Sequence, residues 1–260
     1  MKIELCQTNI IWENKKANLE KAEKIISQSN SDLLLFPEMS FTGFSSNTEL
    51  TGEKDNFTIN SVKQLSLKYK KAIAFGWVYK KTEKAENHYT FINENGNILS
   101  DYVKIHPFSY SGEDNFFNGG SKINIFHYRD FNICNFICYD LRFPEIFQIA
   151  SKKADLITVA ANWPESRRDH WLTLLKARAI ENICYIAAVN CVGNIGGLYY
   201  SGDSCLINPK GEIMETISNK EGSVSFEITN DTNIYRTNFP AKKDRREDLY
   251  IELNNAPRGN

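Results

Sequence analysis

The chain has 260 residues, of which 42% are hydrophobic and 24% charged, and its formal net charge is -1. This composition is that of an ordinary globular protein, which excludes a disordered or fibrous chain, and we expect one compact domain. Acidic and basic residues are mixed along the whole sequence, so no basic surface for nucleic acid is expected.

The first residues, MKIELCQTNI, lack the basic region, long apolar stretch and cleavage site of a secretory signal. No apolar run reaches the roughly 20 residues needed to cross a bilayer. We therefore expect a cytoplasmic protein that does not bind membranes. A disulfide framework is not expected in a chain of this size in that compartment. The cysteines lie mostly in apolar, strand-like runs, at Cys6, Cys134, Cys138, Cys184, Cys191 and Cys205.

The first half of the chain predicts parallel strands joined by helices. Residues 2–9 and 32–38 have strand-like patterns, and the segment between them places Leu19, Ala22 and Ile26 on one helical face. This βαβ unit implies a parallel sheet. A second helix, with Val62, Leu65 and Tyr69 at helical spacing, precedes a strand over 72–79. Residues 88–104 then form a hairpin, because an Asn-Gly turn separates two alternating runs.

The second half repeats this alternation. A strand pair over 122–128 and 131–140 precedes a helix that starts at Pro144. The strand 155–162, the helix 168–182 and the strand 184–190 follow. Residues 204–217 predict another hairpin, and 223–228 an edge strand. The chain is thus an α/β protein with mixed sheets. We expect a single domain over 1–260, with residues 231–260 and their KKDRRED charge cluster as an exposed C-terminal arm.

Three reactive side chains come at the ends of predicted strands. Glu38 follows LLLFP, Lys104 ends SDYVK, and Cys138 ends NFIC. Ligands of open α/β sheets bind beyond the carboxyl ends of the strands. The three side chains can therefore converge on one cleft.

Cys138 lies where an alternating apolar run changes to the polar segment YDLRFPE. A helix starting at Pro144 would place this cysteine at a sharp strand-to-helix turn, of the kind that exposes a nucleophile. The positive end of a helix dipole there would favour the thiolate. A buried structural cysteine has the same local pattern, as Cys134 on the same strand face illustrates. The local pattern alone therefore leaves both roles open.

The segments LLLFPEMSFTGF, YVKIHPF and NFICYDLRFPE together resemble three sequence blocks of the nitrilase-like carbon-nitrogen hydrolases. In that superfamily the blocks carry a catalytic glutamate, lysine and cysteine in the same order. The resemblance spans nearly the whole chain and implies these roles for Glu38, Lys104 and Cys138. It also implies the family's four-layer α-β-β-α sandwich of two mixed sheets flanked by helices, which the α/β pattern alone does not establish.

Details of the sequence indicate which branch of the superfamily this chain resembles most. Many members have a second catalytic glutamate, and Glu113 in KIHPFSYSGEDNF lies where it is expected, although Asp114 leaves the register open. The block CYDLRFPE differs from the Cys-Trp-Glu of true nitrilases, which disfavours nitriles. Together with AANWPESRRDHWLTLLKARAIEN it resembles the omega-amidases, which deamidate 2-oxoglutaramate and 2-oxosuccinamate. The branch acting on deaminated glutathione usually has Thr-Gly before its His-Trp, where this chain has SRRD.

The resemblance implies a mechanism without a cofactor. Glu38 removes the thiol proton of Cys138, and the thiolate attacks the amide carbon. Lys104 and the backbone N–H of Tyr139 hold the oxyanion, while Glu113 holds the lysine. Ammonia leaves, and a water activated by Glu38 hydrolyses the thioester. No metal is implied, because the histidines show no ligand spacing; they are His88, His106, His127 and His170.

A substrate of this branch carries a carboxylate, for which arginine is a suitable partner. Arg167 and Arg168 follow the strand end at Asn162 and Trp163, and these four are the candidate substrate-binding residues.

Other charged residues near the cysteine block are assigned to the framework. Arg142 is a candidate for a structural ion pair with Asp140 or Glu145. Arg178 and Glu181 are expected to brace the fold near a subunit interface, because members of the family commonly form homodimers.

Three functions remain to be separated. The first is the omega-amidase acting on a small-molecule amide. The second is a relative that uses the thioester differently, such as a deaminated-glutathione amidase, a carbamoyl-amide hydrolase or an acyltransferase. The third is a catalytically silent binding or scaffold protein, which the presence of Glu38, Lys104 and Cys138 together disfavours.

Overall fold

Two mixed β-sheets lie face to face in the computed structural model, which describes residues 1–80 and 82–256. The first sheet has the strand order β14-β1-β2-β3-β4-β5, with β6 beside β4. Strands β1, β2 and β3 are parallel, so the βαβ prediction is confirmed. The strands of this sheet are β1 (Lys2–Gln7), β2 (Leu33–Leu35), β3 (Ala72–Tyr79), β4 (Ala85–Ile92), β5 (Ile98–Val103), β6 (Phe117–Asn118) and β14 (Gly222–Glu227).

The second sheet has the order β11-β12-β10-β9-β8-β7, with β13 beside β12. Strands β8, β9 and β10 are parallel, and the hairpins β7–β8 and β12–β13 are antiparallel as predicted. The strands are β7 (Ile125–Tyr128), β8 (Phe131–Ile137), β9 (Leu156–Ala161), β10 (Tyr185–Asn190), β11 (Val192–Ile195), β12 (Leu198–Ile207) and β13 (Ile213–Ser218). The next strand, β14, leaves this sheet and joins the first one as its edge strand beside β1.

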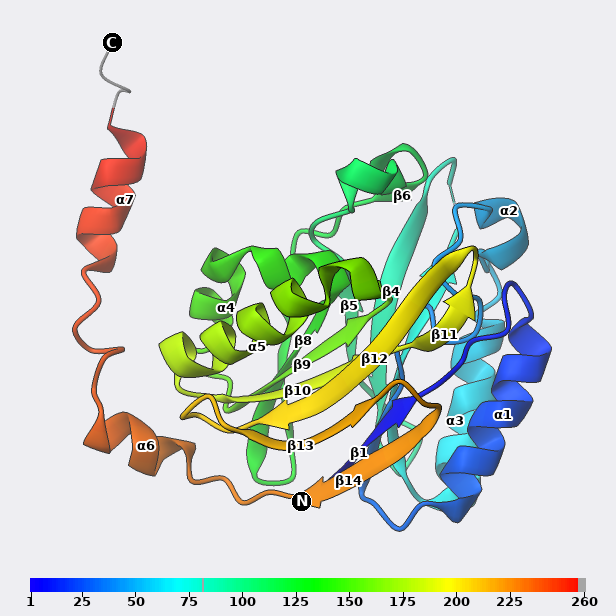
Figure 1. The fold of residues 1–260 in the computed structure, drawn as a ribbon, viewed down its shortest axis with the longest axis horizontal. Coiled ribbons are helices and arrows are strands. Elements are labelled where there is room, and N and C mark those ends of the chain that lie inside the picture. Colours follow the sequence, from blue (N-terminus) through cyan, green and yellow to red (C-terminus); the bar gives the residue numbers. More distant parts are fainter. Residues whose placement is uncertain (81, 257–260) are drawn as a thin grey trace.

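Helices cover the outer face of each sheet, as Figure 1 shows. Helices α1 (Lys15–Gln28) and α3 (Phe57–Tyr69) cover the first sheet, and α4 (Pro144–Ala150) and α5 (Arg168–Asn182) cover the second. The side chain of Asn14 caps α1 by accepting from the Ala17 N–H. The resulting α-β-β-α arrangement is the four-layer sandwich that the resemblance implied.

The short strand β2 shows why the core has these layers. Leu33 and Leu35 point into the core between the sheets, whereas Leu34 packs with the residues under α1 and α3. A strand covered on both faces needs a continuous apolar run, and LLL supplies it. Each leucine buried in this way stabilises the fold by about 1.5–3 kcal/mol. The run therefore fixes the position of the polar turn that follows it.

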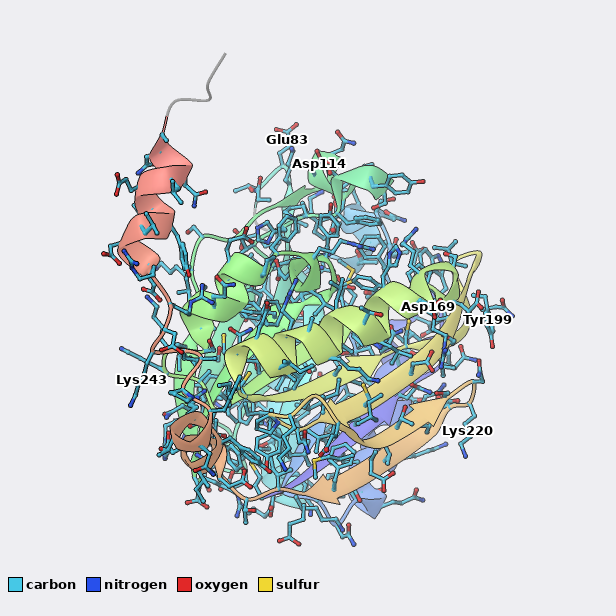
Figure 2. All side chains as sticks on the ribbon, turned by 60° about the vertical axis from the view of Figure 1, so that its left-hand side comes forward. Glu83, Asp114, Asp169, Tyr199, Lys220 and Lys243 are labelled. Atoms are coloured by element: carbon cyan, nitrogen blue, oxygen red, sulfur yellow. The ribbon has the colours of Figure 1, made fainter. Side chains whose placement is uncertain are left out.

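Short helices connect the strands at one end of the sandwich. They are α2 (Thr48–Thr51) and the 3-10 helices η1 (Ser109–Ser111), η2 (Glu113–Asn115), η3 (Cys138–Arg142) and η4 (Glu165–Arg167). Charged side chains such as Glu83, Asp114, Lys220 and Lys243 lie at the periphery of the molecule in Figure 2 and are exposed.

The C-terminal segment carries α6 (Thr232–Asn238) and α7 (Glu247–Asn255). Arg236 on α6 donates to the carbonyls of Ser151, Ala154 and Ile183, so this part is attached to the body. Helix α7 has no buried residue and stands apart from the sandwich in Figures 1 and 2. Among the described residues, no helix has the length and apolar character needed to cross a membrane.

Candidate active site

Glu38 lies in the turn that follows β2, and its side chain is fully buried. This turn packs directly on Gly76 of β3, whose N–H donates to Ser40 Oγ and whose carbonyl accepts from the Ser40 N–H, both at 2.9 Å. A Cβ at position 76 would lie only 2.3 Å from the Met39 nitrogen. Glycine at 76 is therefore required for the turn that places Glu38.

Lys104 is held between two carboxylates. Its Nζ lies 2.9 Å from Oε1 of Glu38 and 2.8 Å from Oε2 of Glu113, and none of the three residues is more than 3% exposed. The Asn87 Nδ2 donates to both carboxylates, at 2.8 Å to Glu38 and 3.2 Å to Glu113. Burial alone would lower the pKa of Lys104, but Glu113 and Glu38 raise it far above its ordinary value. The lysine is thus a permanent cation inside the protein.

Their positions decide which of Glu113 and Asp114 is the second carboxylate of the site. Glu113 is buried, and its Oε2 also accepts from the Phe108 N–H at 2.5 Å. Asp114 is exposed. The two neighbouring carboxylates point in different directions because they start η2, and only Glu113 turns toward the lysine.

Cys138 occupies a strained turn between β8 and η3. Its φ of 44° lies in the left-handed region, which costs a residue with a side chain about 1–3 kcal/mol. The sharp strand-to-helix turn predicted from the sequence is present, although a 3-10 helix over Cys138–Arg142 precedes the α-helix at Pro144. The backbone N–H of Tyr139 belongs to the first turn of η3, where N–H groups have no acceptor within the helix.

The buried carboxylate of Asp140 holds this turn in place. Its Oδ2 accepts from the Tyr102 hydroxyl at 2.7 Å and from the Ile137 N–H at 3.1 Å. Its Oδ1 lies 3.0 Å from the His106 backbone nitrogen and 2.8 Å from the Nδ1 of the same residue. The ring of His106 stacks on Phe143 with centroids 3.7 Å apart, so this histidine has an orienting role.

The environment of Cys138 opposes the thiolate that a helix start would favour. Burial raises the pKa of its thiol well above the ordinary value, and Glu38 and Glu113 raise it further, while Lys104 acts in the opposite direction. A five-residue 3-10 helix has too few aligned peptides to outweigh two carboxylates. The resting sulfur therefore carries its proton and needs a base to remove it.

Asn162 fixes the position of Glu38. Its backbone N–H donates to Glu38 Oε2 at 2.9 Å, and its side-chain Nδ2 donates to the Glu38 carbonyl at 2.6 Å. Its own carbonyl lies 3.9 Å from the Cys138 sulfur. The predicted substrate-binding residue thus bridges the two sheets at the end of β9.

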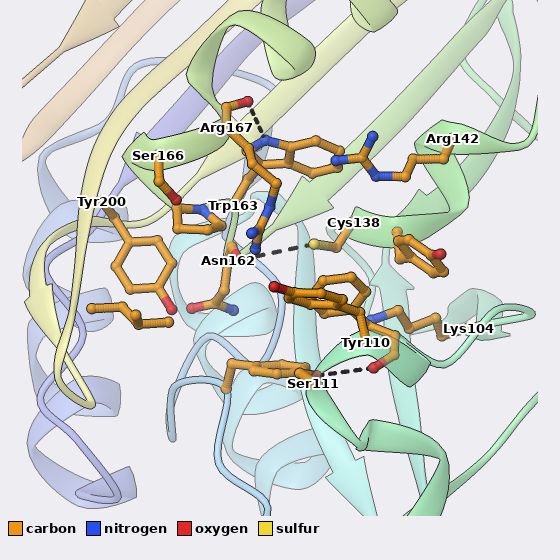
Figure 3. Close-up of a pocket in the computed structure, with 15 residues that line it drawn as sticks. Lys104, Tyr110, Ser111, Cys138, Arg142, Asn162, Trp163, Ser166, Arg167 and Tyr200 are labelled. Atoms are coloured by element: carbon orange, nitrogen blue, oxygen red, sulfur yellow. Dashed lines mark hydrogen bonds between the residues drawn. The ribbon is translucent and has the colours of Figure 1, made fainter.

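Lys104, Cys138 and Asn162 line a cavity of about 240 Å³. Figure 3 shows Cys138 between Lys104 and the arginines, with Trp163 and Tyr110 beside it. The residues that line the cavity are Phe44, Lys104, Phe108, Tyr110, Ser111, Cys138, Tyr139, Arg142, Asn162, Trp163, Pro164, Ser166, Arg167, Leu198 and Tyr200. Most of this lining is apolar or aromatic, and Cys138 itself is partly exposed in it.

The arginines near Cys138 differ from the expectation. Arg167 lines the cavity, as proposed for a substrate-binding residue, but Arg168 points elsewhere and forms two hydrogen bonds to Asp203, each at 2.8 Å. The predicted pairing of Arg142 with Asp140 or Glu145 is wrong. The Asp140 carboxylate already accepts four other hydrogen bonds. Arg142 lies in the cavity wall instead.

Arg178 has the framework role expected of it. It donates to the Leu141 carbonyl from Nε and Nη2 and forms an ion pair with Glu181 at 2.9 Å. Within the described part of the chain, no cluster of three His, Cys, Asp or Glu side chains is arranged to hold a metal ion.

Several residues of the site carry no strong signal in the sequence. Asn87 is one of them. Its position among the inward-facing residues of the alternating strand AENHYTFI could have indicated a buried amide that binds other polar groups. Gly76 and Asp140 are others, because their roles depend on contacts with distant segments of the chain.

Comparison with known proteins adds independent findings. Residues 2–234 match the family model described as carbon-nitrogen hydrolase. The chain is 32% identical over 255 residues to the 2-oxoglutaramate amidase of Bacillus subtilis, covering 95% of this chain and 98% of that protein. It is 33% identical over 251 residues to the omega-amidase YafV of Escherichia coli K12, covering 95% and 97%.

Solved structures show the same fold. The XC1258 protein of Xanthomonas campestris, described as a CN-hydrolase superfamily protein with an arsenic adduct in its active site, superposes with a TM-score of 0.89. Its identity to this chain is 29%, with 94% of this chain and 97% of that chain covered. An amidase from Nesterenkonia has a TM-score of 0.88 at 22% identity, with coverage of 97% and 96%.

Proposed function

The chain belongs to the carbon-nitrogen hydrolase family, and from this we propose that it releases ammonia from the omega-amide of a small 2-oxo dicarboxylic acid monoamide through a thioester on Cys138. The family and its omega-amidase relatives show an enzyme that hydrolyses amides. The observation that carries the proposed mechanism is the buried cluster of Glu38, Lys104 and Glu113 beside the cysteine.

The first step is transfer of the thiol proton. Because the pKa of Cys138 is raised, the sulfur needs a base, and Glu38 is the carboxylate held nearby by Asn162 and Lys104. A proton moves from Sγ to Glu38 as the C–S bond forms, so no free thiolate accumulates. General-base assistance of this kind contributes about 10²–10⁴-fold to a rate.

The second step stabilises the oxyanion. The charge that develops on the amide oxygen is taken by the Lys104 ammonium and by the backbone N–H of Tyr139, and both residues line the cavity. Each such preorganised donor contributes about 3 kcal/mol in comparable sites. Glu113 keeps the ammonium in position and limits its movement toward Glu38.

The third step expels ammonia and restores the enzyme. The proton on Glu38 passes to the departing nitrogen as the C–N bond breaks, which leaves an acyl thioester on Cys138. Glu38, again a carboxylate, then removes a proton from water, and the hydroxide attacks the thioester carbonyl. Breaking the C–S bond releases the acid and returns the proton to the sulfur.

The size of the cavity favours a short substrate. Its volume of about 240 Å³ is below the roughly 300–1,000 Å³ of pockets for drug-sized ligands. A five-carbon oxo acid amide suits this space better than an amide derived from a tripeptide, which supports the omega-amidase over the deaminated-glutathione amidase.

Ammonia release tests the proposal. The substrates are 2-oxoglutaramate, 2-oxosuccinamate, glutamine, asparagine, deaminated glutathione and a carbamoyl amide. We expect preference for the two oxo amides and a loss of at least about 10³-fold in Cys138→Ala, since removal of a nucleophile costs far more than removal of a contact. Mass spectrometry should detect the acyl group on Cys138.

Cys134→Ala is the matched control, because this cysteine lies on β8, the strand that ends just before Cys138, but is buried in the core. It should keep its activity. Turnover by Cys138→Ala equal to that of the wild type would remove the proposed nucleophile, and preference for deaminated glutathione would move the enzyme to the neighbouring branch.

We also propose a cytoplasmic homodimer that binds neither nucleic acid nor membranes, built from one domain with residues 231–260 as an arm. Large apolar side chains exposed on α5 and in the C-terminal segment support an assembly of two chains: Ile180, Ile234, Phe239, Ile251 and Leu253 are each more than half exposed. Light scattering coupled to gel filtration should give twice the mass of the 29.8 kDa chain. A mass of one chain at micromolar concentration would contradict this assembly.

A further inference from the structure

Two arginines in the cavity wall have no carboxylate partner. Within residues 1–80 and 82–256, the ion pairs include those of Arg168 with Asp203 and of Arg178 with Glu181, but none of Arg142 or Arg167. Both of these residues line the same cavity as Cys138. A guanidinium that stays unpaired in a partly buried, mostly apolar site is costly, so its position there calls for an anion from outside the chain.

Arg142 is held in place by contacts that leave part of its donor edge free. Its guanidinium lies over the Trp163 ring, 4.7 Å from the centroid. Its Nη2 is 3.3 Å from Nδ1 of His170, which must be the acceptor because arginine only donates. One nitrogen is therefore occupied, and the remaining N–H groups have no protein acceptor among the described residues.

Arg167 is held by aromatic rings on the other wall. Its guanidinium lies 5.4 Å from the centroid of Phe108 and 5.9 Å from that of Tyr110. Its backbone carbonyl accepts from the Trp163 indole N–H at 2.8 Å, so Trp163 contacts both arginines. Stacking orients a guanidinium without consuming its in-plane donors, which is the arrangement that suits a carboxylate.

The charges in the cavity are arranged asymmetrically. On one side of Cys138, two carboxylates outnumber the single ammonium of Lys104, which leaves a net negative charge. On the other side, in the view of Figure 3, lie Arg142 and Arg167. Burial lowers the pKa of Arg142, and the charge of Arg167 lowers it further, so the two cations repel each other in the absence of an anion.

From this arrangement we propose that Arg142 and Arg167 form a carboxylate clamp, which selects amides bearing a negative charge and places their amide carbon at Cys138. The inference rests on the proposed function and deepens it, since it assigns the charged end of the substrate to named residues. A carboxylate at the arginine end keeps away from the carboxylates of Glu38 and Glu113. The opposite orientation would bring like charges together.

A matched pair of substrates separates charge recognition from catalysis. Glutaramate carries a carboxylate and an omega-amide, and its methyl ester is a neutral amide of similar shape. We expect the wild type to prefer glutaramate. In Arg142→Gln and Arg167→Gln, kcat/KM for glutaramate should fall about 10- to 100-fold each, since a charged hydrogen bond contributes about 1.5–3 kcal/mol. The value for the ester should change less than about 3-fold.

Two further variants complete the test. Arg246→Gln removes the same charge on the C-terminal arm, where the side chain is exposed, and should leave both values unchanged. Arg142→Lys keeps a charge but not the planar fork, so it should restore part of the preference for the anion. A raised KM with a nearly constant kcat is expected for glutaramate, because the clamp acts on binding.

The outcomes distinguish the clamp from the amidase itself. Equal losses for the charged and neutral amides, with an unchanged melting temperature, would overturn the clamp and give the arginines a general structural role. Unchanged kinetics in both Gln variants would also overturn it. A wild-type enzyme that hydrolyses none of the omega-amides would instead overturn the proposed function, whatever the variants do.

Discussion

At the scale of single residues, the site depends on a sulfur that is kept protonated. Glu38 is both the proposed base and one of the charges that raise the pKa of the Cys138 thiol. These two effects act in opposite directions on reactivity. A variant that removes the charge but keeps the shape can therefore separate them.

Glu38→Gln should lower the rate while making the thiol more acidic. Without the carboxylate, the pKa of Cys138 falls toward its ordinary value, because one of the charges that raise it is gone. Turnover of the amide should nevertheless drop about 10²–10⁴-fold, since no base remains to carry the proton. The pH dependence of alkylation by iodoacetamide reports the pKa, and ammonia release reports turnover.

Glu49→Gln is a suitable control, because this glutamate is exposed, pairs with Lys80 and does not line the cavity. It should change neither measurement. An alkylation profile that moves to higher pH in Glu38→Gln would show that the charge of Glu38 does not raise the pKa of Cys138.

The sequence predicted the reactive residues but not the residues that position them. Glu38, Lys104 and Cys138 could be found because each ends a strand and because three sequence blocks occur together. Asn87, Asp140 and the unpaired state of Arg142 could not be found, since each is defined by partners more than 20 residues away. The assignment of Arg142 to an ion pair relied on proximity in sequence, whereas Asp140 already accepts hydrogen bonds from Tyr102, His106 and Ile137.

At the scale of the secondary-structure elements, the turn between β8 and η3 has a strained backbone, which hydrogen bonds to Asp140 stabilise. The positive φ of Cys138 is maintained by four donors converging on one buried carboxylate. Fixing this turn keeps Cys138 and Tyr139 in the wall of the same cavity.

Asp140→Asn should weaken the fold and the reaction together. The amide nitrogen cannot accept hydrogen bonds, so at least one of the donors loses its partner, at a cost of about 1–3 kcal/mol. We expect a lower urea midpoint and a kcat reduced about 10-fold or more, because the strained turn relaxes and misplaces the nucleophile. Urea unfolding and ammonia release measure the two effects.

Asp114→Asn gives the comparison at an exposed aspartate near the same cavity. It should be neutral in both assays. Full activity of Asp140→Asn at wild-type stability would show that the turn does not depend on this carboxylate.

The order of the elements was predictable because hydrophobic periodicity is a local property. The helix over Arg168–Asn182 and the three hairpins follow from patterns within short windows. The position of β14 does not, because its alternating residues fit an edge in either sheet and only the pairing with β1 decides between them. The 3-10 helix at Cys138 was also missed, since its shape follows from Asp140 and not from helix propensity.

At the scale of the whole molecule, six free cysteines are kept protonated by the fold. Burial raises the pKa of the thiols of Cys184 and Cys205 to about 12. It also raises the pKa of the thiols of Cys6, Cys134, Cys138 and Cys191. In the unfolded chain these thiols would ionise near pH 8.5. Their contribution to stability is therefore complete below that pH and declines above it.

Stability should consequently fall steeply in alkaline solution. Each thiol that stays protonated only in the folded state lowers the free energy of unfolding by about 1.4 kcal/mol per pH unit above its unfolded pKa. Lys242 has the opposite sign, because burial lowers its pKa to about 8, but one such group is outweighed by the six thiols.

Thermal unfolding between pH 7 and 10.5 in the presence of a reductant measures this decline. We expect the melting temperature to fall above about pH 8.5. The double variant Cys184→Ala and Cys205→Ala should show a shallower decline than the wild type. A melting temperature that stays constant up to pH 10.5 would mean that the buried thiols ionise without unfolding the protein.

The pairing of β1 with β14 has a further consequence for the synthesis of the protein on the ribosome. The amino group of Met1 binds the carbonyl of Ile228, 227 residues later in the chain. Until that late strand emerges, β1 presents an unpaired edge to every other nascent polypeptide nearby. Chaperones that shield exposed strand edges should therefore stay associated with this chain for most of its synthesis, and their release should coincide with the arrival of β14.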